Sequence, residues 1–168
     1  MQKRLVIFFG KTGAGKNYTA QLFAREFGFY LYDADQDLTV EMKEAIAEGR
    51  IFTDAMRDKY FEVIIEKTRK LLGSHSRIAL AQGLFKNRQR RRVMQAFPFA
   101  KFIWVDAADN IIEQRIVGRD NNVTVEYARR INPLFEAPDF KCEKIVNNCG
   151  FKDLLNEVRK LGTTLKGL

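Results

Sequence analysis

Short apolar runs alternate along the chain with segments whose apolar residues recur at helical spacing. Residues 5–9 are five consecutive apolar residues, which is typical of a strand that is covered on both faces. We expect further strands at residues 29–32, 77–81, 101–105 and 144–147. The intervals between these strands are long enough for helices, so the chain is predicted to alternate strand and helix.

Apolar residues at helical spacing predict a helix in each interval. After the first strand, Leu22, Phe23 and Phe27 share one face, and Gly28 is expected to end that helix. Equivalent faces follow at Leu38, Met42, Ala45 and Ile46; at Met56, Tyr60, Ile64, Thr68 and Leu72; at Ile112 and Ile116; at Ala128 and Ile131; and at Leu154, Leu155, Val158 and Leu161. A further helix is expected through the basic run at residues 86–92.

Turn and cap residues support this alternation. Gly49 and Gly73 are expected to close the second and third helices, whereas Asp37, Asp109 and Thr124 are candidate N-terminal caps. Five strands that alternate with helices predict an α/β fold of three layers, in which a five-stranded parallel sheet has helices on both faces. Ligands of such sheets bind at the carboxyl ends of the strands.

Length and composition indicate one compact domain. The chain has 168 residues, of which 46% are hydrophobic and 30% charged, and it contains only three prolines. We expect a single domain over residues 1–168, without a linker, a repeat, a signal peptide or a membrane span. Cys142 and Cys149 are too few for a disulfide framework, so both are expected to be reduced and the protein to be cytoplasmic.

The net charge of +8 favours anionic partners, among them nucleotides, sugar acids, nucleic acids and acidic membranes. The sharpest concentration of charge is KNRQRRR at residues 86–92. Because charge runs usually face water, most of this run is expected to form a solvated helix face. We therefore expect a small-molecule partner ahead of a nucleic acid and no membrane partner, and the oligomeric state is left open.

The strongest chemical signal is GKTGAGKN at residues 10–17, directly after the first apolar run. It fits the phosphate-binding pattern G-x-x-x-x-G-K-[ST] except at Asn17, which replaces a hydroxyl residue. Its glycines allow the backbone to curl so that N–H groups face phosphate oxygens, and Lys16 adds a full charge. The alternative is a glycine-rich turn with a chance lysine. We expect contacts to ATP from Gly10, Lys11, Thr12, Gly13, Ala14, Gly15, Lys16, Asn17 and Tyr18.

An acidic pair follows the second expected strand. Asp33 and Asp35 are two residues apart, so both can face one crevice at the end of that strand. Phosphoryl transfer to a hydroxyl needs Mg²⁺ to shield the phosphates and a carboxylate to orient or deprotonate the acceptor. The alternative is that both residues belong to a turn or cap a helix.

Together with EAIAEGRIFTDAMRDKY at residues 44–60 and GLFKNRQR at residues 83–90, these motifs resemble the gluconate kinase branch of the small-molecule kinases. Shikimate kinases and nucleoside monophosphate kinases are more distant relatives of that branch. The resemblance covers residues 4–150 and implies a P-loop kinase fold of the nucleoside monophosphate kinase type, with a short lid at about residues 119–134. It also implies transfer of the γ-phosphoryl group of ATP to a hydroxyl of a sugar acid, most directly gluconate.

The resemblance implies roles for residues around the acceptor. Asp35 would contact the acceptor hydroxyl and serve as the base, and Asp33 would hold Mg²⁺ through water. Gly83 would let the acceptor approach the third strand closely. Lys86 and Arg90 would add positive charge to the same pocket.

Arg57 is the residue through which the resemblance implies an acid as the acceptor. A guanidinium is a planar two-pronged donor, which suits it to grip a carboxylate. The alternative is a surface arginine that pairs with Asp54 or Asp58.

The resemblance also implies a mobile lid whose arginines close over the phosphates and exclude water. Arg119 would stabilise charge on the transferring group, which makes it a catalytic candidate beside Lys16 and Asp35. Arg115 would stack on adenine or contact phosphate, and Asn147 falls on the turn that contacts adenine in relatives. The alternative is that both arginines are exposed helix residues.

The chain departs from the family pattern at the metal site and in the acceptor pocket. The amide oxygen of Asn17 can replace a hydroxyl as a Mg²⁺ ligand, but we expect a weakened or altered affinity for the metal. The histidine that follows the acidic pair in the family is absent here, and the serine-alanine-leucine-lysine stretch is altered at residues 82–86. These changes leave the identity of the acceptor open.

The sequence supports three functions. The first is a small-molecule kinase of a sugar acid, most directly gluconate, with shikimate, a nucleotide or another polyol acid as alternative acceptors. The second is a kinase of nucleic-acid 5′-hydroxyl ends, which the net charge and the arginine run suit. The third is a nucleotide-binding relative without kinase turnover, which Asn17 and the altered pocket suggest.

Overall fold

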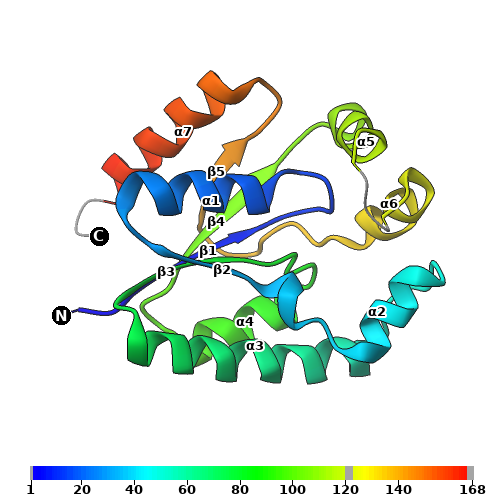
Figure 1. Ribbon diagram of the computed structural model, residues 1–168, viewed down its shortest axis with the longest axis horizontal. Coiled ribbons are helices and arrows are strands. Elements are labelled where there is room, and N and C mark those ends of the chain that lie inside the picture. Colours follow the sequence, from blue (N-terminus) through cyan, green and yellow to red (C-terminus); the bar gives the residue numbers. More distant parts are fainter. Residues whose placement is uncertain (1, 120–122, 166–168) are drawn as a thin grey trace.

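The computed structural model describes residues 2–119 and 123–165, which form an α/β fold (Figure 1). The strands are β1 (Arg4–Phe9), β2 (Tyr30–Asp33), β3 (Arg77–Ala81), β4 (Lys101–Asp106) and β5 (Glu143–Val146). The α-helices are α1 (Lys16–Phe27), α2 (Val40–Ala47), α3 (Asp54–Ser74), α4 (Asn87–Ala96), α5 (Asp109–Val117), α6 (Val125–Ile131) and α7 (Phe151–Thr164). Two 3₁₀ helices, η1 (Ala34–Asp37) and η2 (Asn132–Leu134), complete the described elements.

All five strands are parallel and form one sheet in the order β2-β3-β1-β4-β5. Helices α1 and α7 cover one face of the sheet, and α3 and α4 cover the other (Figure 1). This arrangement confirms the predicted three-layer architecture. The chain places β2 and β3 on one side of β1 and β4 and β5 on the other, so the carboxyl end of β1 is the switch point at which such sheets bind ligands.

Strand β1 is the centre of the core because it is covered on both faces. Each residue from Leu5 to Phe9 exposes 1% or less of its surface. Alternate residues point to opposite faces, so Leu5, Ile7 and Phe9 pack with residues of α3 and α4, whereas Val6 and Phe8 pack with residues of α1 and α7. The uninterrupted apolar run therefore serves two cores at once.

Two of the predicted helix caps are wrong. The N-cap of α2 is Thr39 and not Asp37. The Asp37 carboxylate accepts a hydrogen bond from the Tyr32 hydroxyl at 2.7 Å. Asp109 lies inside the first turn of α5, whose N-cap is Ala108. The prediction for Thr124 is confirmed, since its side chain accepts a backbone N–H of α6.

The predicted glycine ends hold for two helices and fail for a third. Gly28 ends α1 and Gly49 follows α2, both with positive φ angles of 68° and 66°. Gly73, in contrast, lies within α3, which continues to Ser74 and ends where His75 becomes extended. Although α3 has 21 residues, none of the described helices is both long and apolar enough to span a membrane.

The basic run lies on α4 and is largely engaged by carboxylates. Arg88 and Arg92 pair with Asp58 of α3 at 2.9 and 3.4 Å. Arg91 pairs with Asp139. Arg90 is completely buried. The expected solvated face is thus interrupted by one core residue and partly neutralised by its neighbours.

Arg90 crosses the core between two aromatic rings. Its guanidinium carbon lies 4.7 Å from the centroids of both Phe9 and Phe135. Its Nε donates to the Leu84 carbonyl at 2.8 Å, and its Nη1 donates to Asn87 Oδ1 at 2.6 Å. Burial lowers the pKa of this guanidinium to about 10. Arg90 therefore fixes the chain between β3 and α4 from inside the protein.

We expect Arg90→Lys to lower the free energy of unfolding by about 1–3 kcal/mol, because an ammonium cannot reproduce the forked donor and leaves buried acceptors unpaired. Guanidinium chloride unfolding measures the change. Arg91→Lys, at an exposed position of the same helix, is the matched control and should change stability by less than about 0.5 kcal/mol. Equal stability of the two variants would contradict the structural role of Arg90.

Candidate active site

The turn after β1 passes so close to other segments that two of its positions have no room for a side chain. A Cβ atom on Gly10 would lie 2.1 Å from the Val105 carbonyl oxygen of β4, and one on Gly15 would lie 2.3 Å from Asn147 Nδ2. Gly15 also has a φ of 92°, which favours glycine. The turn leads directly into α1 at Lys16, so the positive end of the helix dipole lies beside it. Phosphate-binding turns have this geometry.

Two buried asparagines hold the turn from outside. Asn132 brackets Thr12: its Oδ1 accepts the Thr12 N–H and its Nδ2 donates to the Thr12 carbonyl, both at 3.0 Å. Asn147 Nδ2 donates to the Ala14 carbonyl at 3.0 Å. Because the turn is already ordered by these contacts, a ligand that binds there loses less free energy to ordering.

Arg115 adds a third contact behind the turn. Its Nη2 donates to the Asn147 carbonyl at 2.7 Å, and its Nη1 donates to the Ala14 carbonyl at 3.3 Å. Burial lowers the pKa of Arg115, and the neighbouring charge of Arg119 lowers it further. Arg115 therefore joins the phosphate turn to the Asn147 turn, whereas its contact with a nucleotide stays a prediction.

Asn17 and Asp33 connect the start of α1 to the end of β2. Asn17 Nδ2 donates to Asp33 Oδ2 at 2.8 Å, and Asp33 Oδ1 accepts the Asp35 N–H at 3.0 Å. Burial raises the pKa of Asp33, and the charge of Asp35 raises it further. Asn17 Oδ1 is buried and accepts no hydrogen bond from the residues that the structure describes.

The unpaired amide oxygen of Asn17 fits a hard cation. Mg²⁺ takes oxygen ligands, and in kinases it is held by one or two protein groups together with phosphate oxygens and water. The hydrogen bond to Asp33 orients the Asn17 amide so that Oδ1 is left for this task. Both Asp33 oxygens already accept hydrogen bonds, which suits an Asp33 contact through water. Within residues 2–119 and 123–165, no cluster of three or more His, Cys, Asp or Glu could hold a metal.

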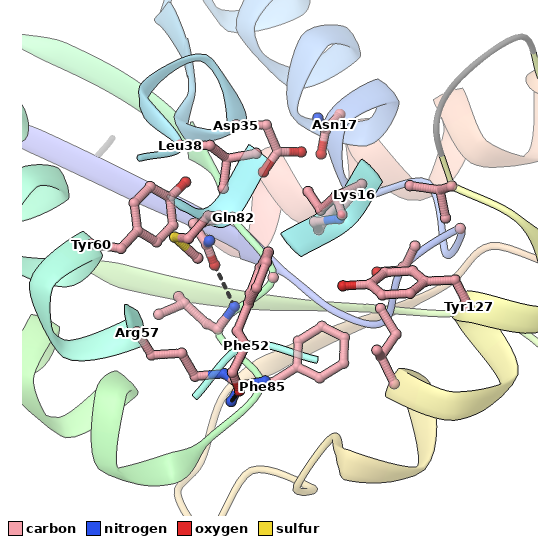
Figure 2. Close-up of a pocket in the computed structure, with 18 of the residues that line it drawn as sticks. Lys16, Asn17, Asp35, Leu38, Phe52, Arg57, Tyr60, Gln82, Phe85 and Tyr127 are labelled. Carbon is pink, nitrogen blue, oxygen red and sulfur yellow. Dashed lines mark hydrogen bonds between the residues drawn. The ribbon is translucent and has the colours of Figure 1, made fainter. Parts of the chain in front are cut away.

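A cavity of about 280 Å³ extends from the phosphate turn toward α2, α3, α4 and α6 (Figure 2). Its polar or charged lining residues are Thr12, Lys16, Asn17, Asp35, Arg57, Tyr60, Gln82, Gln89, Arg119 and Tyr127. Apolar lining residues include Leu38, Met42, Phe52, Phe61, Phe85 and Ile131. Figure 2 shows Lys16, Asn17 and Asp35 grouped at one end and Arg57 at the other. The cavity therefore has the turn after β1 at one end and the Arg57 guanidinium at the other.

Three of the expected acceptor residues line this cavity together: Asp35, Arg57 and Gly83. Lys86 and Arg90 do not line it, in contrast to the expectation. Lys86 Nζ pairs with Glu136 at 3.2 Å, and Arg90 is enclosed between core rings. These two side chains therefore make structural contacts and add no positive charge to the cavity lining.

Arg57 lies in the first turn of α3 and reaches the cavity from there. Its Nη1 donates to the Phe52 carbonyl at 2.5 Å, and the Asp54 carboxylate lies 4.0 Å away. Burial lowers the pKa of Arg57, and Asp54 partly opposes this shift. Since a guanidinium has five N–H donors, these contacts leave donors for a ligand.

Residues on either side of positions 120–122 line one side of the cavity. Arg119 and Val123 line it, and α6 adds Tyr127 and Ile131. These residues belong to the lid expected at 119–134, of which residues 120–122 lie outside the described part of the chain. The motion of this lid stays a prediction.

Sequence reasoning missed three asparagine and glutamine side chains. Asn132 anchors the phosphate turn, and Gln82 Oε1 accepts the Leu84 N–H at 2.5 Å, which shapes the chain after β3. Gln89 lines the cavity from α4. Lys86 is not the Ser or Thr of a helix-capping pattern, so the sequence carries no local signal for Gln89.

Comparison with known proteins identifies the family to which the chain belongs. The family model described as shikimate kinase matches residues 12–138. A search among curated proteins found no match. An unliganded sugar kinase from Janibacter sp. HTCC2649 has a TM-score of 0.82 at 19% identity, over 99% of this chain and 98% of that one.

Two further solved structures share the fold. A gluconokinase from Sinorhizobium meliloti 1021 has a TM-score of 0.77 at 16% identity, over 96% of this chain and 94% of that one. The APS kinase of Mycobacterium tuberculosis, in complex with AMPPNP and APS, has a TM-score of 0.68 at 16% identity, over 99% of each chain. At such identities these structures show the fold alone, which is that of the P-loop kinases.

We expect Asn17→Thr to lower the Mg²⁺ concentration for half-maximal rate several-fold, because it restores the hydroxyl that the phosphate-binding pattern contains. A Mg²⁺ titration of ADP release measures the effect. Asn156→Thr, at an exposed position of α7, is the matched control. An unchanged titration would show that the Asn17 amide serves the metal as well as a hydroxyl does.

Proposed function

The chain belongs to the shikimate kinase family, and we propose that it transfers the γ-phosphoryl group of ATP to a hydroxyl of a sugar acid, with gluconate as the first acceptor to test. Membership of this family makes it a small-molecule kinase. One observation carries the choice of acceptor: Asp35 and Arg57 line the same cavity as Lys16 of the phosphate turn. A carboxylate and a guanidinium thus face the place where a phosphorylated nucleotide would end.

The proposed reaction assigns each residue one task. The acceptor hydroxyl oxygen forms a bond to the γ-phosphorus, the bond from this phosphorus to the β–γ bridging oxygen breaks, and ADP leaves with that electron pair. The hydroxyl proton passes to Asp35. Lys16 and Arg119 neutralise charge on the phosphate oxygens. Asn17, and Asp33 through water, would hold Mg²⁺, which would supply charge to shield the phosphates.

Arg57 supports an acid as the acceptor. Its side chain, of which 12% is exposed, lies at the end of the cavity away from the phosphate turn, and its remaining N–H donors can bind a carboxylate oxygen. An acid held there would extend its hydroxyl-bearing carbons toward Asp35. The sugar kinase and the gluconokinase among the similar structures support a sugar acid within this class.

The contacts of the basic run argue against a kinase of nucleic-acid ends. Arg88 and Arg92 are engaged by Asp58, and Arg90 is buried in the core. Arginines that are already paired offer fewer charges to a phosphate backbone, so counterion release on nucleic-acid binding would be small. A relative without turnover is likewise less supported, because the phosphate turn and Asp35 still meet in one cavity.

A coupled assay of ADP release tests the proposal directly. The purified protein is offered gluconate, shikimate, nucleosides and 5′-hydroxyl oligonucleotides, each with ATP and Mg²⁺. We expect turnover with the acids, and first of all with gluconate. Phosphorylation of oligonucleotides with a steep dependence on salt would instead support the nucleic-acid function. Binding of ATP without turnover of any acceptor would support the inactive relative.

We expect Asp35→Asn to lower the rate with the active acid by about 10² or more, because the amide cannot take the hydroxyl proton. Lys16→Ala is expected to lower it similarly through loss of charge at the phosphates. Asp153→Asn, at an exposed position of α7, is the matched control and should leave the rate unchanged. Full activity of the Asp35→Asn variant would show that the base has been assigned to the wrong residue.

A further inference from the structure

Gln89 carries a buried hydrogen-bond donor at the edge of the acceptor cavity. It lies in the first turn of α4, and only 1% of its surface is exposed. Its Oε1 accepts the Lys86 N–H at 3.2 Å. This hydrogen bond turns the amide oxygen toward the start of the helix and the amide nitrogen away from it. Its Nε2 is buried and donates to no acceptor in the described part of the chain.

An unpaired donor in this position is costly unless a ligand uses it. Leaving a buried polar group without a partner costs about 1–3 kcal/mol, and most buried side-chain donors are therefore paired. Gln89 is among the residues that line the cavity, so its amide belongs to the cavity wall, and an acceptor that packs against this wall can offer an oxygen to Nε2. The binding energy released there would favour a ligand that places an oxygen at this point.

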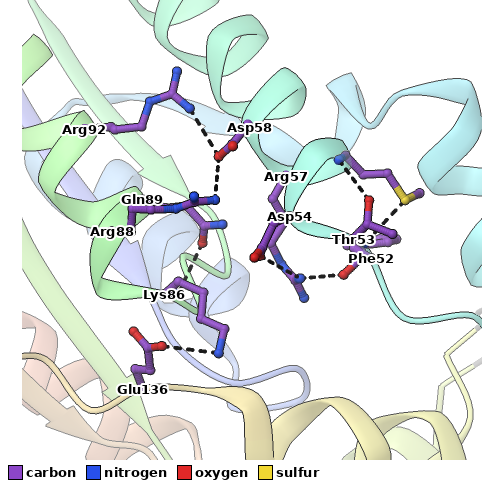
Figure 3. Close-up of polar contacts among 11 residues, drawn as sticks. Phe52, Thr53, Asp54, Arg57, Asp58, Lys86, Arg88, Gln89, Arg92 and Glu136 are labelled. Atoms are coloured by element: carbon purple, nitrogen blue, oxygen red, sulfur yellow. Dashed lines mark hydrogen bonds and ion pairs between the residues drawn. The ribbon is translucent and has the colours of Figure 1, made fainter.

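Gln89 and Arg57 enter the cavity from neighbouring helix starts. Asp58 follows Arg57 in the chain and Arg88 precedes Gln89, and these two neighbours form an ion pair at 2.9 Å (Figure 3). The ion pair holds the first turns of α3 and α4 together. A charged donor and a neutral donor are thereby presented to one cavity from adjacent turns.

Two other polar groups of the cavity are already engaged, those of Tyr60 and Gln82. The Tyr60 hydroxyl donates to the Ala34 carbonyl at 2.6 Å, and Gln82 Oε1 accepts the Leu84 N–H at 2.5 Å. Much of the remaining lining is apolar. Of the lining residues on α3 and α4, Arg57 and Gln89 are therefore the donors left for the acceptor.

We propose that Gln89 is a specificity-determining residue of the acceptor site, an inference that rests on the proposed function. Its Nε2 donates to one oxygen of the acceptor carboxylate while Arg57 binds the other oxygen. Because both groups are donors only, the pair selects a carboxylate and disfavours a cationic or amide-terminated acceptor at this end.

Gln89→Glu tests this role without removing the helix cap. Glu is as suitable as Gln at this capping position, and one of its oxygens can still accept the Lys86 N–H. The other oxygen replaces the free donor with a negative charge, which repels a carboxylate. We expect the KM for the acid to rise about tenfold or more, with kcat and the KM for ATP little changed.

The same substitution at an exposed position of α4, Gln95→Glu, is the matched control. Turnover is measured with gluconate and with shikimate, and binding of both acids is measured by calorimetry in the presence of AMPPNP. A raised KM or Kd for the acid in Gln89→Glu, but not in Gln95→Glu, supports the inference. Identical values for the two variants overturn it while the proposed function stands. Failure of both acids to bind the wild-type protein overturns the proposed function and this inference with it.

Discussion

The hydrogen bonds from Asn132 and Asn147 to the backbone of the phosphate turn are the contacts on which the candidate site depends. They occupy the Thr12 and Ala14 carbonyls, and Arg115 gives the Ala14 carbonyl a second donor. The turn is thereby kept curled without a bound anion. Since these asparagines come from segments far along the chain, the phosphate site forms only when the carboxyl edge of the sheet has assembled.

The same edge links phosphate binding to the acceptor cavity. Asn17 starts α1 and holds Asp33, and Asp33 in turn accepts the N–H of Asp35. A hydrogen-bonded path therefore runs from the phosphate turn to the proposed base. Most of the positive side chains of α4 pair with carboxylates or lie in the core, whereas Arg57 of α3 lines the cavity. The net charge of the chain is thus a poor guide to where an anion binds.

The sequence was sufficient for the architecture and for the phosphate turn, because both depend on local patterns. The apolar run of β1 and the glycine spacing of residues 10–15 carry their meaning within a few residues. The burial of Arg90 depends on Phe9 and Phe135, which are distant in the chain, so a local charge run could not reveal it. The cavity position of Gln89 likewise depends on the packing of α4 against α3, which no single segment specifies.

The central claim is that the turn at residues 10–16 binds the phosphates of ATP and directs the terminal one toward Asp35. A crystal structure with a non-hydrolysable ATP analogue and Mg²⁺ tests this claim most directly. The account predicts phosphate oxygens on the backbone N–H groups of the turn, Lys16 beside the terminal phosphate, and Asp35 facing that phosphate across the cavity. A nucleotide bound elsewhere, or a terminal phosphate that faces away from Asp35, would contradict it.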